Sequence, residues 1–215
     1  MVVSPHLDDA VFSIGAAMWQ ATRAGHTVSV LTVLAGDEAS DVSVGPWHRE
    51  SGFRTAGEAA AARAAEDEAA CRIVGARAQR LPYLDKDFER ELDDDEVLRT
   101  VTDAVGGCDN VLLPGFPLTN EDHLWLAHLC ERLDVPARIG YYAEQPYTTW
   151  RRTSPADAEP ERGWQHLTVS AAAQAAKLRA CRAYKSQIPL LGGMRGLLGV
   201  LSYEARLGGE SVCWT

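Results

Sequence analysis

The sequence lacks the features that mark membrane proteins and nucleic-acid-binding proteins. None of its apolar stretches is long enough to span a bilayer, and Met1–Pro5 carries no basic region followed by an apolar run. Basic residues are in deficit, because 21 Lys and Arg stand against 30 Asp and Glu, for a formal net charge of −9 at pH 7. Binding to a phosphate backbone needs clustered Lys and Arg. We therefore expect neither a membrane nor a nucleic acid as a partner.

Paired cysteines and phosphate-binding glycine motifs are missing as well. The five cysteines are odd in number and include no CxxC pair, which favours reduced thiols in a cytoplasmic protein. No GxGxxG or Walker sequence follows the first apolar stretch, where nucleotide-binding folds cradle phosphate. A nucleotide-binding or regulatory module is therefore an alternative that the sequence weakens.

What remains is the composition of an ordinary globular protein, 46% hydrophobic and 24% charged. Its 215 residues suit one compact domain spanning 1–215. Short β-branched stretches alternate with apolar residues at helical spacing. The predicted strands are Val2–Ser4, Thr27–Leu34, Arg80–Leu84, Val111–Leu113, Arg138–Tyr142 and His166–Val169. The predicted helices are Asp9–Ala24, Glu58–Val74, 93–105, Asp122–Leu133, Ser170–Ser186 and Met194–Arg206.

This alternation predicts an α/β fold with a Rossmann-like, mostly parallel sheet and helices on both faces. The segment 36–54 is expected to be a polar loop, and the amphipathic Met194–Arg206 helix covers the core or forms a contact in a homo-oligomer. In such sheets, ligands bind outside the carboxyl ends of the strands. The chemistry should therefore lie just after the strands.

The first predicted strand is followed at once by an imidazole and two adjacent carboxylates, His6, Asp8 and Asp9. A divalent metal ion needs ligands that are already deprotonated and can converge. His6 and Asp9 can both coordinate one ion from a tight strand-to-helix turn, whereas Asp8 is placed to take a proton from a bound water. The alternative is that an aspartate only caps the helix that starts near Ala10. However, two adjacent carboxylates repel each other unless a cation lies between them.

A second polar group, Asn120, Asp122 and His123, follows the predicted strand Val111–Leu113. His123 offers a second imidazole, which gives a His2Asp set with one or two positions open, as in catalytic zinc sites. Asp122 can orient a neighbouring ring or a bound water. The alternative for His123 is an ordinary surface histidine at a helix start. Four other histidines have no carboxylates in the right places: His26, His48, His128 and His166.

These two groups carry a resemblance to a known family. The stretch His6-Leu7-Asp8-Asp9-Ala10 resembles the His-Pro-Asp-Asp-Glu signature of the LmbE-like deacetylases, also called the PIG-L family. The stretch Asn120-Glu121-Asp122-His123 resembles the family's His-x-Asp-His signature. Arg63–Glu66 and Tyr184–Gln187 add weaker points, so that the resemblance spans nearly the whole chain. Members of this family are zinc-dependent enzymes that remove acyl groups from N-acetylglucosamine conjugates and related molecules.

The resemblance implies a metal-dependent amide hydrolase. Its expected substrate is a small-molecule N-acylated amino sugar or sugar conjugate, such as a glycosylated natural product or thiol conjugate. By the family pattern, His6, Asp9 and His123 hold one divalent metal ion, expected to be zinc, and Asp8 is the general base.

Further residues are candidates for contacts with the substrate. Arg63 and Asp85 stand where the family places polar substrate contacts, although Arg63 can alternatively pair with Glu66 on a solvated helix face. Aromatic faces stack well on sugar rings, and Tyr147 or Trp150 can line an acceptor pocket in this way.

Three residues depart from the family pattern. Leu7 replaces the usual Pro and Ala10 the usual Glu, and neither change removes a ligand. Asn120 stands where the family commonly has a His that stabilises the oxyanion or protonates the leaving group. An Asn amide can donate a hydrogen bond to an oxyanion but cannot act as an acid. Asn120 therefore motivates a further alternative, a metal-binding homologue with impaired catalysis.

Overall fold

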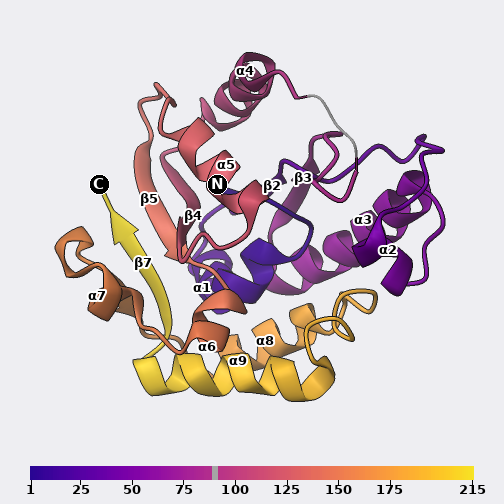
Figure 1. Ribbon diagram of the computed structural model, residues 1–215. Coiled ribbons are helices and arrows are strands. Elements are labelled where there is room, and N and C mark those ends of the chain that lie inside the picture. Colours follow the sequence, from indigo (N-terminus) through magenta and orange to yellow (C-terminus); the bar gives the residue numbers. More distant parts are fainter. Residues whose placement is uncertain (89–91) are drawn as a thin grey trace.

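The computed structural model describes residues 1–88 and 92–215, and within them one sheet of seven strands runs through the molecule (Figure 1). Its order is β3-β2-β1-β4-β5-β7-β6, and the first five strands of the chain pair in parallel. β7 pairs antiparallel with both β5 and β6. The strands are β1 Val2–Ser4, β2 Ser29–Thr32, β3 Arg77–Arg80, β4 Asn110–Phe116, β5 Arg138–Ala143, β6 Gln165–Leu167 and β7 Glu210–Trp214.

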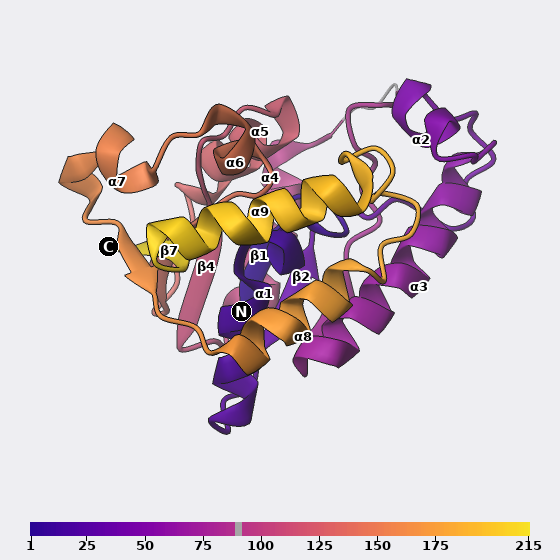
Figure 2. The ribbon, with the colours of Figure 1, turned by 90° about the horizontal axis from the view of Figure 1, so that it is seen from below.

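Helices cover both faces of this sheet, which confirms the predicted α/β architecture. α4 and α5 pack on one face and bury Val97, Val101 and Leu126, while α1, α3 and α8 pack on the other. Seen from below, α9 lies across the outside of the second layer (Figure 2). The helices are α1 Asp9–Arg23, α2 Pro46–Glu50, α3 Ala56–Val74, α4 Asp94–Val105, α5 Glu121–Cys130, α6 Tyr147–Arg151, α7 Pro155–Ala158, α8 Ala171–Cys181 and α9 Gly193–Leu207, with a 3-10 turn at Pro160–Arg162. Among the described residues, none of the helices is both long and apolar enough to cross a membrane.

Several predicted helix ends are confirmed by their capping contacts. Gly75 ends α3 in the left-handed conformation with φ of 79°, which a residue without Cβ adopts at no steric cost. Ser170 caps α8, because its hydroxyl accepts a hydrogen bond from the backbone N–H of Ala173 at 3.2 Å. Downstream, α8 ends at Cys181, earlier than the predicted Ser186.

Two strand predictions were wrong in position or extent, and one strand was missed. The predicted strand Arg80–Leu84 is displaced, since β3 is Arg77–Arg80 and lies at the exposed edge of the sheet, where no apolar pattern is needed. β4 continues through Pro114 to Phe116, with a register shift between these two residues, instead of stopping at the proline. β7 was not predicted, because four of its five residues are buried, Glu210 among them, and they show no alternation. Likewise, the predicted loop 36–54 contains the short helix α2.

A buried ion group ties β7 to the helices beneath the sheet. The Lys177 ammonium on α8 donates to the carboxylates of Glu204 at 2.8 Å and Glu210 at 2.7 Å, and all three side chains are almost wholly buried. It also donates to the backbone carbonyl of Ser13 in α1. α1 is interrupted at Ile14, where φ is −131° and ψ is 26°. The freed backbone N–H groups of Ala16 and Ala17 donate to Glu210, so the interruption leaves these polar groups satisfied.

Replacing Lys177 should therefore destabilise the fold strongly. In Lys177→Met, two carboxylates lose their buried cation, and we expect the free energy of unfolding to fall by about 3–5 kcal/mol. Urea denaturation followed by circular dichroism measures this change. The matched control is Lys185→Met at an exposed lysine, for which we expect a change within about 0.5 kcal/mol. Equal stabilities of the two variants would contradict the role given to the buried group.

Candidate active site

The site lies where the strand order reverses, at the carboxyl ends of β1 and β4. His6 lies two residues after the end of β1, Asp9 is the first residue of α1, and His123 lies in the first turn of α5 after β4. Ser4 fixes the turn between β1 and α1, because its hydroxyl donates to the His6 carbonyl at 2.8 Å and accepts from the Ala10 N–H at 3.1 Å. The parallel pairing of β1 with β4 thus brings together the two polar groups found in the sequence.

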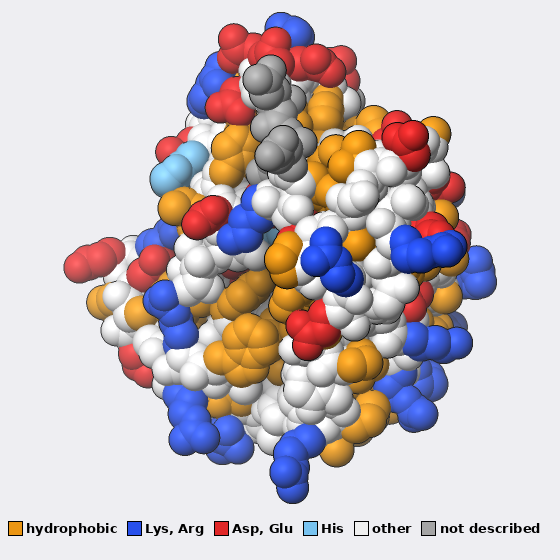
Figure 3. Space-filling model, turned by 45° about the vertical axis from the view of Figure 1, so that its right-hand side comes forward, with side chains coloured by type: hydrophobic (Ala, Val, Ile, Leu, Met, Phe, Trp, Pro, Cys, Tyr) orange, Lys and Arg blue, Asp and Glu red, His pale blue; other side chains and the backbone are white. Residues whose placement is uncertain are grey.

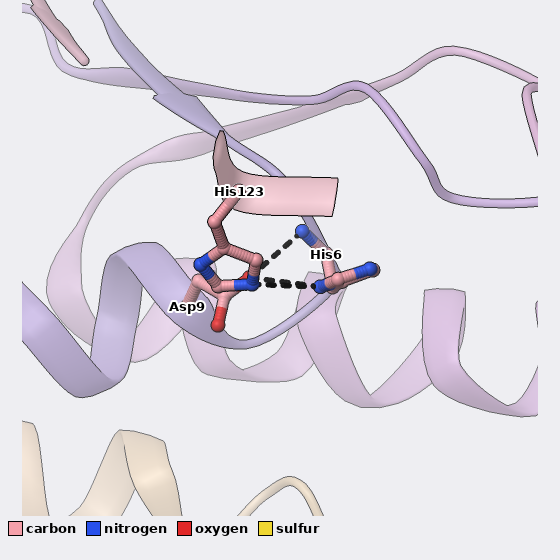
Figure 4. A group of neighbouring side chains, drawn as sticks. All are labelled: His6, Asp9 and His123. Atoms are coloured by element: carbon pink, nitrogen blue, oxygen red, sulfur yellow. Dashed lines mark hydrogen bonds and ion pairs between the residues drawn. The ribbon is translucent and has the colours of Figure 1, made fainter. Parts of the chain in front are cut away.

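Three potential ligand atoms face one another at nearly equal distances (Figure 4). His6 Nδ1 lies 3.1 Å from His123 Nε2 and 3.2 Å from Asp9 Oδ2, and His123 Nε2 lies 3.3 Å from Asp9 Oδ2. Zinc ligands at about 2.0–2.1 Å in tetrahedral geometry are separated by roughly 3.3 Å. The triangle therefore has the size of one face of a tetrahedral site, and these residues fit a divalent ion.

The remaining nitrogen of each imidazole is held by a buried carboxylate. His6 Nε2 lies 3.0 Å from Asp122, and His123 Nδ1 forms a short hydrogen bond with Glu144 at the end of β5. Asp122 also accepts a hydrogen bond from the backbone N–H of Lys86. Histidines that bind metals commonly donate their second N–H to a carboxylate, which fixes the tautomer and the ring orientation. Glu144 was missed in the sequence, although its position after a predicted parallel strand is a signal that could have found it.

The electrostatics of this group favour a positive charge between the ligands. Burial disfavours the charged His6 ring, but hydrogen bonds to Asp122 and Asp9 outweigh it and raise the pKa of His6 to about 10. Burial also opposes ionisation of Asp9, yet the nearby His123 and His6 outweigh it and lower the pKa of Asp9. Protons on the imidazoles occupy the place that a metal ion can take.

Asp8 lies beside the triangle without belonging to it. Its carboxylate faces Arg63 at 3.8 Å, and its side chain is nearly buried. Burial and then the charge of Asp9 raise the pKa of Asp8 to about 7. A carboxylate with a pKa near the working pH is well suited to accept and return a proton.

A cavity of about 380 Å³ opens next to these residues. The predicted contacts Arg63, Asp85 and Tyr147 all line it, together with Asp8 and Asn120. Its mouth is aromatic: Trp47 is 41% exposed and Trp150 54% exposed, and both line the cavity. The space-filling view shows hydrophobic side chains gathered around a hollow on this side of the molecule (Figure 3).

The structure contradicts the alternative given for Arg63 and the expectation about His48. Arg63 does not pair with Glu66 on a solvated face; it is 5% exposed, while Glu66 accepts hydrogen bonds from Ser186. His48 was set aside because no carboxylates stand in the right places around it in the sequence, but its Nδ1 lies 3.0 Å from Asp87. Residues this far apart along the chain meet only through the tertiary fold, which sequence spacing does not report.

The side chain of Asn120 has a fixed orientation at the start of α5. Its carbonyl oxygen accepts a hydrogen bond from the Asp122 N–H at 2.9 Å, which caps the helix. Its amide nitrogen therefore faces Tyr147 and donates to the phenol oxygen at 3.4 Å. The Tyr147 ring also packs edge-on against His123, with ring centroids 5.3 Å apart. Because the phenol oxygen accepts from Asn120, its own proton stays available to a ligand in the cavity.

A family match covers the part of the chain that holds His6, Asp9 and His123. The family model described as "PIG-L: GlcNAc-PI de-N-acetylase" matches residues 1–133. A search of the curated proteins found none that matches the chain.

Solved structures of deacetylases are similar over nearly the full length. The A40926 pseudoaglycone deacetylase Dbv21 is 25% identical with a TM-score of 0.80, over 99% of this chain and 94% of its own. The zinc-inhibited form of the teicoplanin deacetylase Orf2 is 23% identical with a TM-score of 0.76, over 99% and 96%. The N,N'-diacetylchitobiose deacetylase from Pyrococcus horikoshii is 17% identical with a TM-score of 0.66, over 100% and 81%.

Glu144 gives a test of the ligand set. In Glu144→Gln, the His123 ring loses its anionic partner, and we expect zinc affinity to fall by about tenfold or more. Competition with a chromogenic chelator measures the affinity, and Glu131→Gln at an exposed carboxylate is the control. Unchanged zinc affinity in Glu144→Gln would contradict the orienting role of this carboxylate.

Proposed function

Because the chain belongs to the PIG-L family, described as GlcNAc-PI de-N-acetylase, we propose that it hydrolyses the N-acyl amide of an amino sugar carried on a larger molecule. The observation that carries this proposal is the triangle of His6 Nδ1, Asp9 Oδ2 and His123 Nε2, with the Asp8 carboxylate beside it at a cavity. A metal-ligand set next to an independent base is the arrangement of a metallohydrolase.

The proposed cofactor is one divalent ion, with zinc as the expected metal, held by His6, Asp9 and His123. Bound there, it supplies Lewis-acid activation of water and of the amide carbonyl. Asp122 and Glu144 keep the two imidazoles in the tautomers that leave His6 Nδ1 and His123 Nε2 free as ligands.

Asp8 handles the proton in the proposed reaction. Its carboxylate takes one proton from the attacking water as the water oxygen bonds to the amide carbon. The carbon–nitrogen bond then breaks, and Asp8 returns the proton to the departing nitrogen, which leaves as an amine. The acyl group leaves as a carboxylic acid.

Tyr147 and Asn120 are the proposed donors to the oxyanion. The phenol proton of Tyr147 is free because its oxygen accepts from Asn120, and the Asn120 amide retains a second N–H. Both side chains line the cavity. Hydrogen-bond donors fixed in advance stabilise the charge that develops on the carbonyl oxygen. Neither is an acid suited to protonate an amine, so the proton of the leaving group is assigned to Asp8.

The proposed substrate class follows from the cavity and from similar proteins. A cavity of about 380 Å³ with Trp47 and Trp150 at its mouth suits a sugar ring joined to a further apolar group. Similar structures are those of deacetylases for the A40926 pseudoaglycone, teicoplanin and diacetylchitobiose. These similarities support an N-acylated sugar conjugate as the small-molecule partner.

Asn120 keeps a second candidate in place, a metal-binding homologue with impaired catalysis. This candidate requires the metal ligands but not Asp8, whereas the hydrolase requires both.

The predicted homo-oligomer contact at α9 stays a prediction. Met194 and Leu198 on this helix are exposed apolar side chains that such a contact would use.

The Asp8→Asn variant separates these candidates. We expect both this variant and the wild type to bind about one zinc per chain, and we expect the variant to lose about 10²–10⁴-fold in amide hydrolysis, because it has no base. Mass spectrometry gives the metal content, and amine release from N-acetylglucosamine conjugates gives the activity. His6→Ala is the comparison and should lose both zinc and activity. Undiminished turnover of Asp8→Asn would overturn the base assignment.

Tyr147→Phe tests the oxyanion donors. Removing the phenol hydroxyl should lower kcat about 10²-fold with little change in KM, because the lost hydrogen bond forms mainly in the transition state. Tyr203→Phe on α9 removes a hydroxyl outside the residues that line the cavity and is the control. A kcat that is the same in both variants would remove Tyr147 from the mechanism.

A further inference from the structure

One imidazole in the cavity has no part in the proposed chemistry. His48 on α2 lines the cavity, yet its side chain is almost fully buried. Its ring lies against Phe88, with ring centroids 5.2 Å apart. A buried histidine in a catalytic cavity invites the interpretation that it replaces the acid missing at Asn120.

Both ring nitrogens of His48 are engaged. Nδ1 lies 3.0 Å from Asp87 Oδ2, and the same oxygen accepts from the His48 backbone N–H at 3.3 Å. Nε2 lies 3.1 Å from Nη1 of Arg63. A second carboxylate, Asp85, is farther from Nε2, at 3.6 Å.

The chemistry of arginine decides the direction of these bonds. A guanidinium has only donors, so Nε2 of His48 must be the acceptor and the ring proton must lie on Nδ1, where it is donated to Asp87. His48 is therefore neutral, with its free lone pair already used. Burial and then the charge of Arg63 lower the pKa of His48, in agreement with this state. A neutral ring that accepts a hydrogen bond cannot supply the missing proton.

Among the described residues, Arg63 depends on this acceptor more than on any carboxylate. The nearest carboxylate oxygens in that part of the chain, on Asp8 and Asp85, lie at 3.8 and 4.0 Å, longer than the bond to His48. The Arg63 Nε is buried and has no hydrogen-bond partner within residues 1–88 and 92–215. The guanidinium is thus held in place by a neutral group, which leaves its charge to act on an oxygen of a bound molecule.

The backbone around Asp87 is built for the same contact. A Cβ on Gly45, at the start of α2, would overlap the backbone and the carboxylate of Asp87. The φ of Gly45 is −72°, which any residue can adopt, so the close approach rather than the backbone conformation requires glycine. This close approach lets the Asp87 carboxylate contact the ring Nδ1 of His48 and also accept from the His48 backbone N–H.

We propose that His48 is a positioning residue, clamped by Asp87, that fixes the guanidinium of Arg63 as the donor to an acceptor oxygen of the substrate. This role rests on the proposed amide hydrolysis. The three side chains form a series of hydrogen bonds with one direction: Arg63 donates to His48, and His48 donates to Asp87.

Two variants of His48 distinguish the effect of its hydrogen-bond acceptor from the effect of its ring shape. His48→Phe keeps a flat ring and has no acceptor, whereas the Oε1 of His48→Gln can accept from Arg63. We expect His48→Phe to raise KM for an N-acetylglucosamine conjugate about 10-fold or more with kcat little changed, because a hydrogen bond to a charged group is lost. His48→Gln should stay within about threefold of the wild type. Zinc content should be unchanged in both. Equal impairment of the two variants, or an unchanged KM in His48→Phe, would overturn the proposal.

A double-mutant cycle tests whether His48 acts through Arg63. In an Arg63→Met background, His48→Phe should cause no further change in KM, because the guanidinium that it positions is absent. An additive loss would show that His48 acts by another route and would overturn the proposal.

A readout without turnover separates this proposal from the proposed function. Nitrogen-15 NMR of the histidine rings should find His48 protonated on Nδ1 and not on Nε2 at neutral pH, and Asp87→Asn should disturb this state. A proton on Nε2 would overturn the proposal whether or not the protein hydrolyses amides. Conversely, a wild-type protein without amide hydrolysis but with the Nδ1–H tautomer would sink the proposed function and leave the clamp standing.

Discussion

The parallel pairing of β1 with β4 is the constraint on which the site depends. Val2 and Leu112 are register partners in this pairing, and each strand releases its following loop at the same edge of the sheet. His6 and Asp9 follow β1, and His123 follows β4, so potential ligands from distant parts of the sequence meet within hydrogen-bond distance. The reversal of strand order at this point also opens the space into which the cavity extends.

Charge balance explains why this arrangement is built from so many partners. Asp9, Asp122 and Glu144 are buried carboxylates in a small volume, with the nearly buried Asp8 beside them, and isolated buried charges are costly. Each is offset by an imidazole, by Arg63 or by backbone N–H groups. Residues that a catalytic scheme would not name are therefore needed to keep the reactive ones ionised and correctly oriented.

The sequence was most informative about features that depend on residues close together along the chain. Strand and helix periodicity predicted the layers, and the tight turn with His6 and Asp9 predicted that these two side chains converge, as they do in the structure. Contacts between side chains from distant elements could not be predicted. The partners of His48 come from a later segment, and Glu144 becomes relevant only when β5 is placed beside β4. β7 was not predicted, because its buried residues show no alternation and its Glu210 is paired with Lys177 on a distant helix.

The antiparallel strand β7 also has a consequence for the solubility of the chain. β7 lies between β5 and β6 and separates β5 from solvent at that side of the sheet. In the part of the chain that the structure describes, β6 joins the sheet by pairing with β7. Loss of β7 would turn β5 into a bare edge with unpaired N–H and C=O groups, a template for intermolecular strand addition. β7 thus guards against aggregation as well as joining β6 to the rest of the sheet.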